Sequence, residues 1–62
     1  MLQDAIRKRR QDLGLTQCEL AEKLQCRQST VSGWERGERM PRVADLYRLA
    51  EVLGCKAADL MQ

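Results

Sequence analysis

Short polar side chains lie between residues 28 and 33, at a spacing that places them on one face of a helix. Gln28, Ser29 and Ser32 can each donate and accept hydrogen bonds, and none of the three carries a charge. Glutamine can bond to the N6 and N7 atoms of adenine together, and serine can bond to several base edges. A helix with this face can read base pairs in the major groove of DNA. Taken alone, the same residues also fit the hydrated side of an ordinary surface helix.

A reading helix needs an inner face that fixes it to a scaffold. Val31 and Trp34 are spaced to supply that face, so we predict a helix over residues 28–35. Thr30 lies towards the anchoring side of this helix, and Gly33 falls on the open side with the polar residues. The open face is therefore short, polar and almost uncharged.

A second helix is predicted directly before the first, over residues 16–24. Thr16 and Glu19 fit a capping box, in which each side chain bonds to the backbone amide of the other residue. The buried stripe of this helix consists of Leu20, Ala21 and Leu24. Residues 25 and 26 are too few to reverse the chain, so the two helices should cross at a steep angle.

Three further helices complete the scaffold. The first covers residues 2–13 and ends at Gly14, and its apolar face consists of Leu2, Ile6 and Leu13. Arg10 falls on or beside that apolar face, where an apolar residue is expected. A fourth helix over residues 43–53 buries Leu46, Leu49, Ala50 and Leu53. A last turn over residues 57–61 docks Leu60 inward.

Length and composition limit the fold. The chain has 62 residues, which is enough for one domain (1–62) with one small core. It has one Pro, four Gly and no Phe, so a turn-rich β protein is disfavoured. We therefore expect an all-α protein, a compact bundle of five short helices.

Positive charge is grouped in two places although the net charge is only +2. One basic run consists of Arg7, Lys8, Arg9 and Arg10, and a second group consists of Arg36, Arg39 and Arg42. Such groups can face the phosphates of a nucleic acid, and they can equally be solvated surface.

Metal, membrane and enzyme functions find little support in the composition. The three Cys lack paired spacing and the chain has no His, so we expect no metal, no cofactor and a reduced, cytoplasmic setting. No apolar stretch approaches the length of a membrane span. A carboxylate pair at catalytic spacing and a glycine-rich phosphate loop are both missing, so we expect neither an enzyme nor a small-molecule substrate.

The sequence resembles the Cro/C1-type (XRE-like) helix-turn-helix family of phage repressors and their bacterial relatives. The resemblance rests on R-x-x-x-G-L-T-Q-x-E-L-A-x-x-L over residues 10–24 and S-T-V-S-x-W-E-x-G over residues 29–37. It continues in L-x-x-L-A-x-x-L-G over residues 46–54. The resemblance implies a lambda-repressor-like DNA-binding fold, with the helix over residues 28–35 in the major groove.

The resemblance also implies roles for single residues. The implied base-reading positions are Arg27, Gln28, Ser29, Ser32 and Gly33. The implied phosphate contacts are Gln17, Arg36, Arg39 and Arg42. Thr30 joins them from its own position near the edge of the helix, where it could contact a phosphate or offer a methyl group to a base. Arg10 and Glu35 match a pair that forms a partly buried ion bridge in the family, which would explain the basic residue in the first helix.

Some residues depart from the family pattern. Gln25 stands where the family usually has Gly, so we expect a strained left-handed backbone there. Cys26 and Cys55 replace Val or Ile and should behave as small hydrophobic residues. Arg27 and Lys56 replace the usual Ser or Thr helix caps, and each loses a capping hydrogen bond.

The expected function is that of a sequence-specific transcriptional regulator, a repressor or Cro-like protein that binds a pseudo-palindromic operator. The resemblance implies a homodimer. We expect its contact to use the fourth and fifth helices through Tyr47, Leu60 and Met61, and to be weak without DNA. One alternative is a DNA-binding antitoxin that neutralises a protein toxin. Another is a helical protein-interaction module without DNA affinity, against which the polar face of residues 28–32 and its arginines argue.

Overall fold

Five α-helices account for most of residues 2–61, which are the residues that the computed structural model describes. They are α1 (Leu2–Asp12), α2 (Gln17–Leu24), α3 (Gln28–Glu35), α4 (Val43–Leu53) and α5 (Ala57–Leu60). Within these residues there is no β-strand. The all-α, five-helix prediction is confirmed, and each predicted helix end lies within one residue of the observed one.

The capping box at the start of α2 forms as predicted. Thr16 Oγ1 accepts a hydrogen bond from the Glu19 N–H at 3.0 Å, and a Glu19 carboxylate oxygen accepts one from the Thr16 N–H at 2.9 Å. The bond from the Thr16 backbone stabilises the charged carboxylate, so the pKa of Glu19 lies below its usual value. These bonds fix the first turn of α2 where Gln17 begins the helix.

The starts of α4 and α5 are stabilised in a way that the sequence analysis missed. Arg42 and Lys56 stand at the cap positions and have no side-chain acceptor. Asp45 and Asp59, three residues further on, each accept the backbone N–H of the cap residue at 3.1 Å. Each helix start thus keeps half of a capping box, whereas Arg27 at the start of α3 makes no side-chain capping bond.

The turn between α2 and α3 is built around Gln25, which has φ 57° and ψ 43°. The following N–H, that of Cys26, donates to the Ala21 carbonyl at 3.0 Å and closes the end of α2. The same closing bond ends α4, where Gly54 takes the left-handed position and Cys55 donates to Ala50 at 2.9 Å. The strained backbone predicted at Gln25 is therefore present, because no glycine occupies that position.

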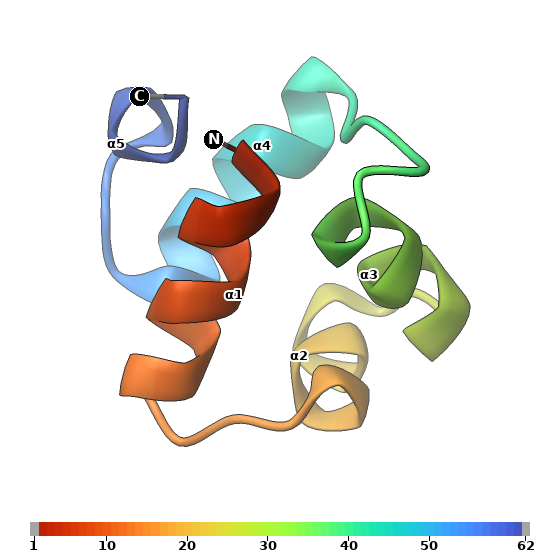
Figure 1. Ribbon diagram of the computed structural model, residues 1–62. Helices are drawn as coiled ribbons and strands as arrows, with labels where there is room; N and C mark the ends of the chain where they lie inside the picture. Colours follow the sequence, from red (N-terminus) through yellow and green to blue (C-terminus); the bar gives the residue numbers. More distant parts are fainter. Residues whose placement is uncertain (1, 62) are drawn as a thin grey trace.

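The core gathers residues from all five helices, and α1 lies across α4 with α2 and α3 on one side and α5 on the other (Figure 1). The buried apolar residues are Ile6, Leu20, Ala21, Leu24, Val31, Trp34, Leu49, Ala50, Leu53 and Leu60. Leu13, predicted to be part of the apolar face of α1, is 51% exposed. That prediction is wrong, because α1 ends at Asp12 and Leu13 no longer follows the helical stripe. Leu46 is only partly buried.

Two of the three cysteines pack against the core. Cys26 and Cys55 are partly buried there, whereas Cys18 is exposed, and all three are free thiols. Burial raises the pKa of the Cys26 thiol, which keeps it protonated at neutral pH. This environment agrees with the prediction that Cys26 and Cys55 act as small hydrophobic residues.

No helix within residues 2–61 is both long and apolar enough to cross a lipid bilayer.

Candidate nucleic-acid interface

Helix α3 is held to the scaffold by one side and open on the other. Val31 and Trp34 are almost fully buried, with 0% and 5% exposure. Gln28 and Ser29, in the first turn, are exposed. Arg27, at the start of the helix, is exposed beside them. The predicted anchoring face and the first half of the predicted polar face are therefore both present.

Ser32 lies one turn further along α3 and is only partly exposed. Its hydroxyl donates a hydrogen bond to Gln17 Oε1 at 2.6 Å. Gln17 begins α2, and its Nε2 donates in turn to Glu35 Oε1 at 3.1 Å. Two predicted contact residues, one on each helix, are thus joined to each other and to the end of α3.

The predicted ion pair between Arg10 and Glu35 is confirmed. Arg10 Nε lies 2.6 Å from Glu35 Oε2, and Arg10 Nη2 lies 2.9 Å from Glu35 Oε1. Their side chains are 11% and 2% exposed. Arg10 Nη1 also donates to the Leu15 carbonyl at 2.8 Å, which ties the loop before α2 to the pair. A planar guanidinium suits this bidentate arrangement.

Arg7 adds a contact that the sequence analysis did not predict. Its Nη2 donates to the backbone carbonyl of Glu35 at 2.8 Å, and its Nε lies 3.8 Å from Glu35 Oε1. Arg7 stands one helical turn before Arg10, a spacing that could have revealed the contact. Part of the first basic run is therefore used to hold α1 against the end of α3.

The Glu35 carboxylate is ionised although it is buried. Burial alone raises its pKa, but the hydrogen bonds from Arg10 and Gln17 and the charges of Arg10 and Arg7 outweigh that effect. The pKa of Glu35 consequently lies below its usual value. A charged carboxylate at this position accepts hydrogen bonds and donates none.

Gly33 does not lie on an open face. It is buried, and a Cβ placed on it would come within 2.9 Å of Arg39 Cδ and 3.1 Å of Arg39 Cγ. The expectation that Gly33 shares the open side with Gln28 and Ser29 is therefore wrong. The side chain of Arg39 crosses α3 at the point where Gly33 leaves room for it.

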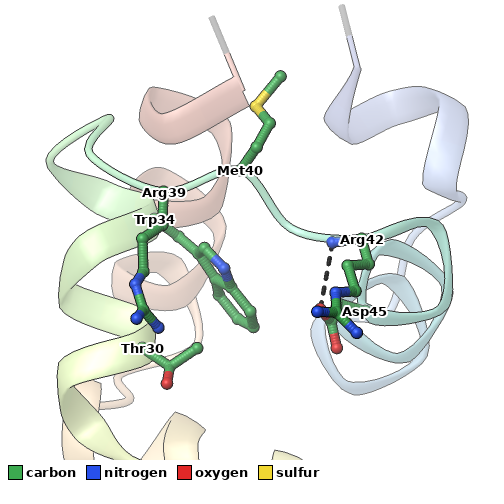
Figure 2. Close-up of a pocket in the computed structure, with 6 residues that line it drawn as sticks. All are labelled: Thr30, Trp34, Arg39, Met40, Arg42 and Asp45. Carbon is green, nitrogen blue, oxygen red and sulfur yellow. Dashed lines mark hydrogen bonds between the residues drawn. The ribbon is translucent and has the colours of Figure 1, made fainter.

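A hollow lies between α3, the following loop and the start of α4. The residues around it are Thr30, Trp34, Arg39, Met40, Arg42 and Asp45. Figure 2 shows the Arg39 side chain running along α3 towards Thr30, with Arg42 and Asp45 on the opposite side at the first turn of α4. The dashed line marks the bond from the Arg42 N–H to the Asp45 carboxylate. Two guanidinium groups and a helix N-terminus beside the hollow favour a bound anion, and the Asp45 carboxylate at the same N-terminus offsets part of that positive charge.

The remaining predicted contact residues, one for phosphate and three for a dimer, do not line this hollow. Arg36 is exposed and pairs with exposed Glu38 at 3.0 Å, which offsets part of its charge. Leu60, predicted to be part of a dimer surface, is fully buried in the core. The prediction of a dimer contact at Leu60 is wrong, whereas the prediction that the last turn docks Leu60 inward is confirmed. Tyr47 and Met61 are exposed, at 66% and 60%.

Comparison with known proteins adds to this geometry. The helix-turn-helix family model matches residues 6–60. The chain is 42% identical over 52 residues to the HTH-type transcriptional regulator DicA of Escherichia coli K12, and the match covers 84% of this chain and 38% of DicA. The chain therefore spans well under half the length of that relative.

Two solved structures have the same fold. The DNA-binding domain of the P22 C2 repressor (1–76) is 30% identical with a TM-score of 0.94, and the match covers 98% of this chain and 80% of that one. The hydroxypropylphosphonic acid epoxidase of S. wedmorenis is 30% identical with a TM-score of 0.88, covering 95% of this chain and 31% of the epoxidase. The fold thus also occurs as a small part of an enzyme.

Proposed function

Because this chain belongs to the Cro/C1-type helix-turn-helix family, we propose that it is a sequence-specific DNA-binding transcriptional regulator of the repressor or Cro-like kind. One observation supports this most strongly. Helix α3 is anchored by Val31 and Trp34 and exposes Gln28 and Ser29 beside a group of arginines. An anchored helix with short polar groups outward suits the width and hydrogen-bonding pattern of the major groove.

In this proposal the contact residues fall into two sets. Arg27, Gln28, Ser29 and Ser32 read base edges, and Gln28 is suited to a bidentate contact with adenine. Gln17, Thr30, Arg36, Arg39 and Arg42 contact phosphates, which positions the protein without specifying sequence. Gly33 contributes by leaving space for Arg39. The role of Gly33 is thus revised from reading bases to placing an arginine.

The start of α2 offers a further phosphate contact. The Thr16 side chain accepts a hydrogen bond from the Glu19 N–H, and the Thr16 carbonyl accepts one from the Leu20 N–H. The amides of Gln17 and Cys18, in the first turn, have no acceptor among these bonds. Free amides at a helix N-terminus favour an anion. Gln17 also keeps the second N–H of its side-chain amide for a phosphate.

We further propose that two copies bind a pseudo-palindromic operator, as dimers of helix-turn-helix proteins do. Tyr47 and Met61 are the exposed apolar residues of α4 and of the segment after α5 that such a contact would use. The chain acts by binding DNA and not by catalysis. We infer a cytoplasmic location, because the matched regulator DicA belongs to a bacterium, whose DNA lies in the cytoplasm.

Selection from a pool of random DNA duplexes tests the proposal. Purified protein is incubated with the pool at low salt and at physiological salt, and the bound duplexes are sequenced. We expect one enriched motif with two-fold symmetry, and an affinity that falls steeply as salt rises. Gln28→Ala should relax the motif at one base per half-site. If a folded protein enriches no motif at either salt, the proposal is wrong.

A further inference from the structure

A continuous row of hydrogen bonds runs from the buried ion pair to the surface that would face DNA. It joins Arg10 to Glu35, Glu35 to Gln17, and Gln17 to Ser32. Each bond in the row has a direction, because each group in it is limited in what it can donate. The directions together decide which hydrogen bond Ser32 can still make.

The first fixed group is the Glu35 carboxylate. It is 2% exposed and receives two bonds from Arg10, at 2.6 and 2.9 Å. A carboxylate paired in this way is ionised and accepts hydrogen bonds only. Whichever group of Gln17 faces Glu35 Oε1 at 3.1 Å must therefore be a donor.

The second fixed group is the Gln17 amide. Its only donor is the NH₂ group, so Nε2 must face Glu35 and Oε1 must point the other way. The reversed amide would place two oxygens against each other near a buried charge. The Oε1 atom, thus oriented, lies 2.6 Å from Ser32 Oγ. A carbonyl oxygen accepts only, so Ser32 must be the donor in this bond.

Ser32 has a single O–H, and that proton is now committed to Gln17. Its oxygen keeps lone pairs that can accept. We propose that Gln17 is a positioning residue that turns Ser32 into an acceptor, so that Ser32 reads an amino group of a base and rejects base acceptors. In the major groove the amino groups are N6 of adenine and N4 of cytosine, whereas N7, O6 and O4 are acceptors.

This inference rests on the proposed function, since it requires that α3 enters the major groove. Ser29 provides an internal contrast. It is exposed and lies outside the row of hydrogen bonds, so its hydroxyl can rotate and either donate or accept. Two serines three residues apart on one helix would then read bases by different rules.

The test uses the selected duplex with single atoms altered. The base pair to alter is the one at which Ser32→Ala no longer shows a sequence preference. In one duplex this pair lacks the exocyclic amino group, with purine in place of adenine or 2-pyrimidinone in place of cytosine. A second duplex carries 7-deazapurine, which lacks the N7 acceptor. Affinities of each duplex are measured for the unsubstituted protein, Ser32→Ala and Gln17→Ala. A loss of affinity that the unsubstituted protein and Ser32→Ala show equally comes from the altered duplex itself. Any additional loss shown by the unsubstituted protein is due to the contact made by Ser32.

We expect removal of the amino group to weaken binding of the unsubstituted protein about 3- to 10-fold more than binding of Ser32→Ala, the worth of one hydrogen bond. Removal of N7 should show no such excess. In Gln17→Ala the Ser32 hydroxyl is free to donate a hydrogen bond. The additional loss of affinity on removal of the amino group should then shrink, and removal of N7 can cause an additional loss of its own. Ser29→Ala is the matched control and should keep the amino-group effect.

Several outcomes would overturn the inference while leaving the proposed function intact. They are an enriched motif with no position that depends on Ser32, or an excess loss at N7 in the unsubstituted protein. An amino-group effect that is unchanged in Gln17→Ala would do the same. Thermal melting of Gln17→Ala shows that the variant is folded. If it does not fold, the comparison of the unsubstituted protein with Ser32→Ala still decides which base atom Ser32 contacts. Enrichment of no motif would instead reject the proposed function itself.

Discussion

Gly33 and Arg39 are in direct contact across the end of α3, with the Arg39 stem lying where a side chain at position 33 would be. A Cβ on Gly33 would come within 2.9 Å of Arg39 Cδ. Because the arginine stem is flexible, a side chain at position 33 would move Arg39 and not the helix. The glycine and the arginine thus pack together as one unit, although they stand six positions apart in the chain.

The variant Gly33→Ala tests this unit. Alanine is favoured over glycine inside a helix by about 1 kcal/mol, so we expect the free energy of unfolding to stay constant or to rise. The affinity for the selected duplex should fall, because Arg39 is displaced. In an Arg39→Ala background the same substitution should cause no further loss of affinity. A loss that persists in that background would mean that position 33 itself contacts the DNA.

The buried ion pair should dominate the stability of the domain. Arg10→Met leaves the Glu35 charge buried without its main partner, and we expect a loss of ~3 kcal/mol in the free energy of unfolding. For a domain of this size the melting temperature should fall by roughly 12–24 °C.

Arg7→Met is the matched control for that loss. Arg7 is 46% exposed and makes one backbone bond to Glu35, so its loss should cost clearly less. Replacement of both partners, Arg10→Met with Glu35→Leu, should restore part of the stability. Equal melting temperatures for Arg10→Met and the unsubstituted protein would show that the pair contributes nothing.

Acid should weaken the domain through the same carboxylate. The pKa of Glu35 is lowered in the folded state, whereas an unfolded glutamate titrates near about 4.3. The stabilisation is therefore complete above the unfolded pKa, and it is lost as the pH falls through the folded pKa. Urea unfolding at neutral pH should show Glu35→Gln to be less stable than the unsubstituted protein. That difference should shrink between about pH 5 and pH 3, and a constant difference across this range would contradict the assignment.

The left-handed residue at the end of α2 offers a way to stabilise the protein. Gln25 has φ 57°, a conformation that costs a residue with a Cβ about 1 kcal/mol. Gln25→Gly should raise the melting temperature by several degrees, and Gln25→Ala, which keeps the Cβ, should not. Destabilisation by Gln25→Gly would mean that the glutamine side chain holds the turn by a contact of its own.

The helices were predictable because their signals are local. Thr16 and Glu19 form the capping box three residues apart, and the apolar stripes of α2 and α4 follow the helical period. The Arg10–Glu35 pair is separated by 25 residues and was predicted only through the family resemblance. The capping bonds of Asp45 and Asp59 are also local. They were not predicted because the cap residues, Arg42 and Lys56, have side chains that cannot accept a hydrogen bond.

The contacts between elements could not be read from the sequence. Whether Ser32 reaches Gln17 depends on how α2 crosses α3, and no local signal fixes that angle. The position of Arg39 over Gly33 depends on the path of the loop before α4. Leu60 was predicted both to dock inward and to join a dimer surface, because an apolar residue in a short helix fits either a core or an interface. Packing of the whole chain decides such cases.

The most direct test of the proposed interface is to follow the backbone amide NMR signals while the selected duplex is added. We expect the largest shifts at residues 17–18, 27–33 and 36–43, and smaller ones near Tyr47 and Met61, where the second copy would contact the first. A scrambled duplex of the same length should produce smaller shifts that vanish at physiological salt. Shifts confined to α5 and the exposed side of α4, with α3 silent, would contradict the claim that α3 reads DNA.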